Sequence, residues 1–453
     1  MAVIETNQNH EVSRWQRIDW RSPWTMFWVG LAVRVLYITI ARSYHFRAFA
    51  DHFEFGWEMG RIARGLAIGH GYADPFVSNT GPTAWNPPLY PLILAGVFKL
   101  CRVYSLLSGW TILSINSIFS AATIPAVYEI AKRCYGRLPN GASIAQWSGW
   151  LWALYPAAMQ YAVRWVWEMT LTTMLFAWVL VIALRMRGIG GDAKNTSSYW
   201  LLFGLLWGGV ALSNPSPLLF LPVCGLWVVL GAKNKAAAFR GVVLSAVVFF
   251  ACLAPWAIRN WRVFHAFIPI RGNLGAELYA GNGPGSTGFP WGGTLPIVDG
   301  GRLIAEYRDM GEVRYVRMRD EMAKAYIRAH RIHFVKISLK RVYFYWIGVP
   351  HPAQAHPGGE FVREINFSFL TFSGLLGLWL ALRRRIPAAG LFLWAFLLLP
   401  VSYYFVTPGA RFRHPLEPLI TILSVCLFQS AEKSWRVRWF RNAFSQQRTQ
   451  SSR

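Results

Sequence analysis

Apolar residues in this chain come in blocks of roughly 17–25 residues, the length that crosses the hydrocarbon core of a bilayer as a helix. Short polar loops separate the blocks. Within lipid the backbone must satisfy its own hydrogen bonds, so such blocks predict helices. About ten spans are predicted, at 24–41, 109–131, 147–163, 166–184, 199–213, 215–231, 241–257, 367–382, 388–406 and 415–430.

Two long segments, 42–108 and 258–366, interrupt this pattern. In the first, the shorter apolar run at 88–100 contains two prolines and predicts a re-entrant or surface helix rather than a span. In the second, the glycine-rich stretch 281–301 predicts an irregular loop. Apolar residues recur near helical spacing through 311–347, with basic residues between them, which predicts an amphipathic helix on the membrane surface.

The short loops give the expected orientation. Basic residues follow the second, fourth, sixth and eighth predicted spans, and a basic tail, 431–453, follows the tenth. Short cytoplasmic loops of membrane proteins are enriched in lysine and arginine, whereas long loops do not obey this rule. We therefore predict cytoplasmic N- and C-termini, two long segments on the outer face, and one integral-membrane domain, 1–430, before the tail.

Composition agrees with this membrane assignment. The chain has 453 residues, of which 54% are hydrophobic and 15% charged, against about a quarter charged in soluble domains. The first apolar block lacks a small-residue cleavage site, so it reads as a permanent anchor. The five cysteines show no CxxC spacing and predict buried thiols. The net charge of +25 is spread over loops and tail, which favours contact with anionic headgroups over nucleic acid.

The first long segment opens with a dense group of charges, ADHFEFGWEMGRIAR. A helix at about 54–68 would place Glu54, Glu58 and Arg61 on one face, with Asp51 at its N-cap or one turn upstream. The ordinary interpretation is a helix cap followed by surface ion pairs. Ionisable groups beside a bilayer more often serve a pathway or a site, so these carboxylates are candidates for chemistry.

A further carboxylate, Glu168, lies in the short outward turn RWVWEM between two predicted spans. It stands four residues after Arg164, and the two side chains could simply form an ion pair. Glu168 also belongs to the same predicted face as Asp51. A carboxylate in that position could act as a base or orient a substrate.

Arginines gather on the same predicted face. Arg259 and Arg271 follow the seventh span, and Arg411 and Arg413 precede the tenth. Such arginines often only extend toward lipid headgroups. Guanidinium groups also bind phosphate in bidentate fashion, and a departing lipid phosphate needs its charge stabilised. These four residues are therefore candidate phosphate ligands.

Several familiar signatures are absent from the sequence. It contains no P-loop, HExxH or GxSxG motif, and no GxGxxG motif in a βαβ setting. No cluster of histidine and acidic residues has metal-ligand spacing, so neither a metal nor another cofactor is predicted.

The order of motifs along the chain resembles a family, the GT-C glycosyltransferases. The resemblance rests on ADHFEFGWEMGRIARGLAIGHGY, NPPLYPLILAGVFKL, GLLWGGVALSNPSPLLFLP, PWAIRNWRVF and RFRHPLEPL, which follow one another from about 24 to 430. The pattern is similar to bacterial members of glycosyltransferase family 39 and its relatives. These relatives include the dolichyl-phosphate-mannose–protein mannosyltransferases and the aminoarabinose transferase of lipid A.

The resemblance implies a sugar donor linked to a polyprenyl phosphate, a protein, lipid or glycan acceptor on the outer face, and inversion at the anomeric carbon. It maps the family's acidic residue of the first outer loop to Asp51, a second acid to Glu168, and the late arginine motif to Arg411 and Arg413. The family often has an Asp-Glu pair where this chain has Asp51-His52. Glu54 and Glu58 therefore stay open as alternatives for the base.

Two other functions remain to be weighed. A transporter or flippase of lipid-linked sugars would also be polytopic, but such proteins often show paired halves with binding sites at the membrane midplane. Here the halves are dissimilar and the acids gather at the outer interface. A non-catalytic assembly protein with the same fold is the third reading. The sequence favours a bacterial inner-membrane transferase.

Overall fold

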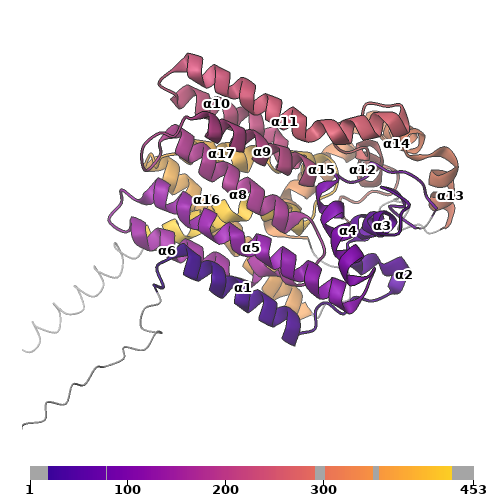
Figure 1. Ribbon diagram of the computed structural model, residues 1–453, viewed down its shortest axis with the longest axis horizontal. Helices are drawn as coiled ribbons and strands as arrows, with labels where there is room; N and C mark the ends of the chain where they lie inside the picture. Colours follow the sequence, from indigo (N-terminus) through magenta and orange to yellow (C-terminus); the bar gives the residue numbers. More distant parts are fainter. Residues whose placement is uncertain (1–18, 78, 291–300, 350–356, 431–453) are drawn as a thin grey trace, which may run out of the picture.

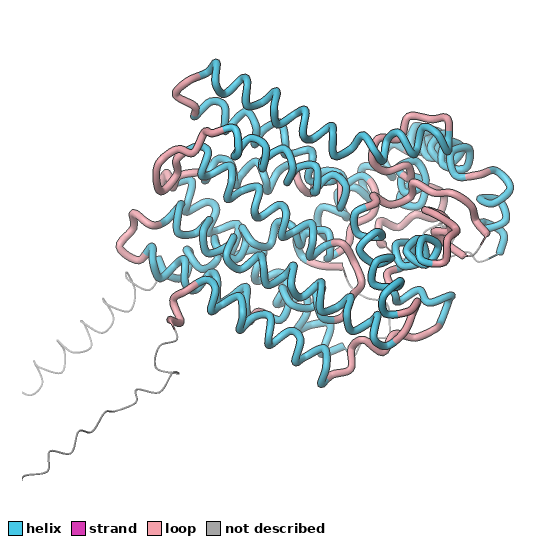
Figure 2. The backbone as a smooth tube through the Cα atoms, in the orientation of Figure 1, coloured by secondary structure: helices cyan, strands magenta, loops and turns pink. Residues whose placement is uncertain are grey.

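The computed structural model describes residues 19–77, 79–290, 301–349 and 357–430. These residues form helices joined by loops, and they contain no strand; one isolated bridge pairs Ala73 with Pro82. Figure 2 shows long helices running side by side across most of the molecule, with shorter helices and loops gathered at one end. The predicted tail, 431–453, lies outside the described residues.

The long helices form a bundle in which each predicted apolar block lies on a helix (Figure 1). They are α1 Pro23–Ile40, α5 Leu106–Tyr135, α6 Gly141–Leu154, α7 Pro156–Val163, α8 Met169–Arg187, α9 Ser197–Ser213, η3 Ser216–Phe220 with α10 Leu221–Gly231, α11 Lys235–Phe264, α16 Pro357–Arg383, α17 Ala389–Leu398, α18 Val401–Phe405 and a last helix at 417–430.

Five of these helices, α1, α5, α8, α11 and the 363–383 part of α16, are long and apolar enough to cross a membrane. The chain is accordingly an integral membrane protein of all-α fold. Other apolar helices, such as α9, are shorter, at 10–17 residues. The count of about ten spans therefore stays a prediction.

The core of the bundle surrounds α5 and α8. Helix α5 packs against α1, α6 and α8, and α9 packs along α11. Small residues permit the second contact: a Cβ on Gly208 would lie 2.7 Å from the Cβ of Cys252. Close approach at small residues is the usual way that helices associate in lipid. All five cysteines are free thiols, three of them buried.

The predicted span at 147–163 is broken between α6 and α7. Pro156 has no N–H, so the carbonyl of Trp152 loses its usual helical donor. Arg34 of α1 takes that place: its guanidinium donates to the carbonyl oxygens of Trp152 at 3.1 Å and Ala153 at 2.8 Å, and to Ser120 Oγ at 3.1 Å. A buried arginine in a span is thereby explained as a structural cap for a broken helix.

The shorter helices come mainly from the two long segments and lie together at one end of the bundle (Figure 1). They are α2 Phe49–His52, η2 Phe53–Phe55, α3 Trp57–Ala67, α4 Leu89–Cys101, α12 Leu274–Asn282, α13 Gly301–Met310, α14 Glu312–Ala329, α15 Arg331–Ile347 and η4 Ala410–Leu416.

The expectations for these segments are met unevenly. Helix α4 coincides with the predicted helix at 88–100. The single amphipathic helix predicted at 311–347 is wrong in one respect, because His330 leaves helical geometry and divides it into α14 and α15. Residues 283–290 of the glycine-rich stretch are non-helical, and 291–300 lie outside the described residues.

A buried polar joint ties the two long segments together. The Glu312 carboxylate of the second segment accepts hydrogen bonds from Thr83 Oγ1 and from the Ala84 N–H at 2.7 Å, both in the first segment. Tyr307 donates to the same carboxylate at 2.7 Å. Around this joint Phe76 and Trp85 pack with aromatic rings of the second segment. The two long segments therefore share a small aromatic core.

Candidate functional site

A cavity of about 1740 Å³ lies where the bundle meets the two long segments. Its wall combines apolar side chains from the bundle with charged ones from the loops. The acidic lining residues are Glu58, Glu168 and Glu277, and the basic ones are Arg164, Arg271, Arg363 and Arg411. A large, mainly apolar pocket with a few convergent polar groups is the usual form of a ligand site.

Helix α3 starts later than the sequence suggested. Gly56 adopts φ 105° and acts as its N-cap, so the helix begins at Trp57, and Glu54 belongs to the preceding turn η2. A positive φ of this kind is readily accessible to glycine alone. The prediction of one helix carrying Glu54, Glu58 and Arg61 on a single face is therefore wrong.

Glu58 lies in the first turn of α3 and lines the cavity. Burial raises the pKa of its carboxyl above the ordinary value, and the negative charge of Glu277 adds to this rise, while Arg61 and Arg411 oppose it. A carboxylate that loses solvation holds protons more tightly and becomes a stronger base. Its position beside the cavity makes it the structure's clearest candidate for proton transfer.

Glu168 is the N-cap residue of α8 and is buried. The side-chain amide of Asn214 donates to its Oε1 at 3.1 Å. Asn214 belongs to the NPSP motif noted in the sequence, which gives that motif a role in holding Glu168. The possible pair with Arg164 does not form in the described structure, because the residues between them are not helical.

Glu277 of α12 was missed by sequence reasoning. Its Oε1 accepts from Asn273 Nδ2 at 3.0 Å and lies 3.3 Å from Arg271 Nη2. A weak signal was present, since Glu277 is the one acidic residue between positions 265 and 298 of the sequence. Nothing local in the sequence shows that this carboxylate and Glu58 face one cavity.

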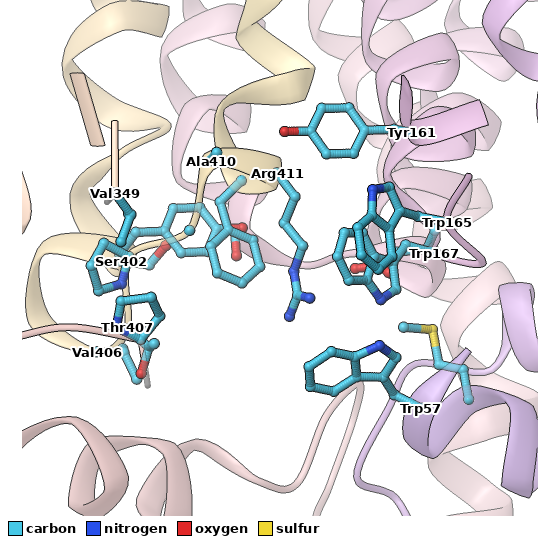
Figure 3. Close-up of a pocket in the computed structure, with 18 of the residues that line it drawn as sticks. Trp57, Tyr161, Trp165, Trp167, Val349, Ser402, Val406, Thr407, Ala410 and Arg411 are labelled. Carbon is cyan, nitrogen blue, oxygen red and sulfur yellow. The ribbon is translucent and has the colours of Figure 1, made fainter. Parts of the chain in front are cut away.

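Arg411 projects into the cavity between aromatic side chains, as Figure 3 shows. Its guanidinium carbon lies 4.3 Å from the ring centroid of Trp167, 4.8 Å from that of Phe412 and 5.6 Å from that of Trp57. Within the described part of the chain, no hydrogen bond or salt bridge engages this guanidinium. A cation held by ring faces keeps its hydrogen-bond donors for an anionic ligand.

The other predicted phosphate ligands have different surroundings. Arg413 is buried beneath the cavity, where it lies 3.4 Å from Glu417 and donates to Thr371 Oγ1 at 2.5 Å. Arg259 donates to the backbone carbonyls of Tyr72 and Thr83, each at 2.7 Å, and does not line the cavity. Arg271 does line it, although it also donates to the Trp85 carbonyl at 3.0 Å.

Asp51 lies on α2 with φ 54°, between Ala50 and His52 in the same left-handed region. It does not cap α3, whose N-cap is Gly56, but lies upstream of that helix, the second of the two positions expected from the sequence. Its carboxylate binds Arg64 in bidentate fashion, at 2.6 and 2.9 Å, and the Arg61 guanidinium donates to the carbonyl of Ala50 at 2.5 Å. Neither Asp51 nor Glu54 lines the cavity; Glu54 instead accepts from the N–H of Arg47.

The structure thus brings Glu58, Glu168, Arg271 and Arg411 together around one cavity and leaves Asp51, Glu54, Arg259 and Arg413 outside its wall. In the ranges that the structure describes, no group of three or more histidine, cysteine or acidic side chains is placed to hold a metal ion.

Comparison with solved structures identifies a shared fold. The archaeal oligosaccharyltransferase AglB from Archaeoglobus fulgidus, in complex with an inhibitory peptide and a dolichol-phosphate, is 14% identical, with a TM-score of 0.51 over 92% of this chain and 52% of that one. Its apo form gives 14% identity and a TM-score of 0.52 over 92% of this chain and 52% of that one.

The same oligosaccharyltransferase, tethered with an acceptor peptide containing the NVT sequon, is 15% identical, with a TM-score of 0.51 over 89% of this chain and 49% of that one. The chain therefore spans about half the length of the structures it matches, and it shares their fold over most of its own length. No model of a known protein family matches the sequence, and no curated protein matches it significantly.

Proposed function

We propose that the protein is a membrane glycosyltransferase that moves a sugar from a polyprenyl-phosphate donor to an acceptor at the outer face of the membrane. The observation that carries this proposal is the cavity lined by both the partly buried Glu58 and Arg411, whose guanidinium has no hydrogen bond or salt bridge within the described residues. The shared fold supports it, since one matched structure contains a dolichol-phosphate.

The proposed reaction is an inverting displacement. An acceptor hydroxyl oxygen attacks the anomeric carbon, the bond from that carbon to the phosphate oxygen breaks, and Glu58 takes the hydroxyl proton. The leaving polyprenyl phosphate gains negative charge, which Arg411 stabilises. Because the donor already carries its leaving group, the step needs no nucleotide.

Glu168 and Asp51 remain in the proposal with other tasks. Glu168, fixed by Asn214, is a second carboxylate able to orient the acceptor. Asp51, to which the family resemblance points, fixes the turn before α3 through Arg64. Its role as the base is the competing assignment within the same reaction.

The proposed arrangement in the membrane has about ten spans, with both termini in the cytoplasm and the cavity at the outer face. The basic C-terminal ends of α5 and α8 lie at the end of the bundle away from the shorter helices of the two long segments (Figure 1), which supports this orientation. Location in a bacterial inner membrane is part of the proposal.

The test begins with deletion of the gene and mass spectrometry of envelope lipids, glycans and glycoproteins. Loss of one glycosylated product, restored by wild-type protein and not by Glu58→Gln, is expected. Reconstituted protein should then transfer sugar from the matching polyprenyl-phosphate donor. Movement of an intact lipid-linked sugar across vesicles without covalent transfer would instead establish the transporter or flippase.

Three variants assign the base. Glu58→Gln should lower turnover by about 100-fold or more, the usual contribution of a general base. Asp51→Asn should resemble Arg64→Met, because both remove the same ion pair. If Asp51→Asn abolishes turnover while Arg64→Met does not, Asp51 is the base and the assignment to Glu58 is wrong.

A further inference from the structure

Asn86 ends the TGPTAWN stretch of the first long segment and lines the cavity. The residue is only 5% exposed, and its Nδ2 has no hydrogen-bond partner among the described residues. Leaving a buried amide unpaired is costly, so native proteins rarely do so without a reason. An unpaired donor of this kind in the wall of a ligand cavity indicates that a bound ligand accepts its hydrogen bond.

The backbone around Asn86 is fixed from several directions. Tyr72 Oη donates to the carbonyl of Asn86 at 2.9 Å and to that of Pro87 at 3.2 Å. Arg271 Nε donates to the carbonyl of Trp85 at 3.0 Å, and the Glu312 carboxylate accepts a hydrogen bond from the N–H of Ala84. The loop therefore cannot shift easily to pair the amide within the protein, and the amide is preorganised for a ligand.

Glu277 lines the same cavity as Asn86. Arg271 connects the two positions, because its Nε reaches the Trp85 carbonyl while its Nη2 lies 3.3 Å from Glu277 Oε1. Asn273 donates to the same carboxylate oxygen at 3.0 Å. Asn86 and Glu277 thus offer an amide and a carboxylate to one cavity, and Arg271 links Glu277 to the backbone of the residue before Asn86.

This pair has the chemistry of a hydroxyl-binding site. A sugar hydroxyl both donates and accepts, so it can donate to a carboxylate and accept from an amide. A phosphate offers acceptor oxygens and negative charge, which the carboxylate of Glu277 repels. Arg411, whose guanidinium contacts aromatic rings and, among the described residues, forms no salt bridge, is the better partner for phosphate.

We propose that Asn86 and Glu277 form the subsite that binds the hydroxyl groups of the transferred sugar. This inference rests on the proposed function and assigns the recognition of the glycosyl group, as distinct from that of the lipid phosphate. Asn86 is then a specificity-determining residue for hexoses and pentoses carried on polyprenyl phosphate.

The experiment compares two probes on purified full-length protein in nanodiscs: undecaprenyl phosphate, and a panel of undecaprenyl-phosphate hexoses and pentoses. Wild-type protein should bind at least one sugar-bearing lipid more tightly than the sugar-free lipid. Asn86→Leu and Glu277→Gln should each reduce that preference by about tenfold and leave affinity for undecaprenyl phosphate unchanged. Asn140→Leu, which removes an amide that donates to the Gln429 carbonyl far from the cavity, should leave both affinities unchanged.

The outcomes separate this inference from the proposed function. If Asn86→Leu weakens the binding of both probes equally, the amide contacts the phosphate and the inference is wrong. The inference is also wrong if Asn86→Leu changes neither affinity, or if the wild type does not prefer any sugar-bearing lipid. Failure of the wild type to bind any of these lipids would count against the donor class itself. Asn86→Asp, which keeps the size of the side chain and removes its donor, takes the place of Asn86→Leu if that variant does not fold.

Discussion

At the scale of single residues, Arg411 and Arg413 show that a sequence motif can identify candidate ligands without showing which of them faces the cavity. Both lie in RFRHPLEPL, and both were predicted as phosphate ligands from the sequence. The segment forms the 3-10 helix η4, with three residues per turn, so residues two apart face different directions. Arg411 faces the cavity, while Arg413 is buried against Glu417. A motif names the residues, but the local helix type decides which of them can meet a ligand.

Substitution of the two arginines should therefore have different effects. Arg411→Met should leave the midpoint of thermal unfolding nearly unchanged and weaken binding of undecaprenyl phosphate by about tenfold or more, since one charge-assisted contact is lost. Arg413→Met should lower stability by about 3–5 kcal/mol, because Glu417 loses a buried partner. Binding and unfolding measurements on both variants check this, and a stable Arg413→Met with weakened binding would contradict it.

Glu58 gives a prediction that depends on pH. Its pKa is raised by burial, so folding favours the protonated form. The stability that this provides is complete below the pKa of the unfolded chain and is lost as pH rises through the folded pKa. The gain in unfolding temperature of Glu58→Gln over wild type should therefore grow between about pH 4 and pH 8.

Two measurements check that prediction. Thermal unfolding of both proteins across this pH range should show a widening difference, and a constant or shrinking one would contradict it. In the wild type, the acidic limb of kcat/KM against pH should lie above the ordinary glutamate value of about 4.3, since that limb reports the free enzyme's base.

At the scale of helices, the sequence located the elements well and their interruptions poorly. Apolar blocks alone placed a helix on every predicted range, because hydrophobic length is read directly from composition. The α6–α7 break is marked by Pro156, yet its consequence depends on Arg34 from a helix more than a hundred residues earlier. The start of α3 at Trp57 was missed because Gly56 interrupts an otherwise helical spacing.

The role of Arg34 can be measured by a double-mutant cycle. Arg34→Leu should destabilise the protein by about 1–3 kcal/mol for each carbonyl left without a donor. Pro156→Ala supplies an N–H that can pair with the Trp152 carbonyl, so Arg34→Leu should cost less in that background. Unfolding of the wild type, both single variants and the double variant in one detergent provides the test. Strict additivity would show that Arg34 does not act on the helix break.

At the scale of the whole molecule, the site is assembled from residues that local patterns cannot connect. Glu58 comes from the first long segment, Glu277 from the second, and Arg411 from the loop before the last helix. The hydrogen bonds from the Thr83 hydroxyl and the Ala84 N–H to Glu312 set how these segments meet. Sequence reasoning placed Glu58, Glu168, Arg271 and Arg411 on one face through topology and family resemblance. The sequence alone could not show that these four residues line the cavity while Asp51 and Arg413 do not, because that difference depends on tertiary packing.

The same assembly gives a topological prediction for the whole chain. If the cavity faces the outside, cysteines placed in the long segments should react with a membrane-impermeant maleimide in intact spheroplasts, and those in the short basic loops only after permeabilisation. His70 and Arg328 serve for the first set and Lys194 and Lys233 for the second, since all four are exposed. The native cysteines are partly or fully buried in helices, and the unsubstituted protein measures their background labelling.

Labelling of Lys194→Cys in intact spheroplasts would show that the orientation is the reverse of the one proposed. Labelling of Lys194→Cys and Lys233→Cys from opposite sides would show that the number of spans between them differs from the proposed two. Either result would place the carboxylates and Arg411 differently with respect to the leaflet from which a polyprenyl-phosphate donor enters.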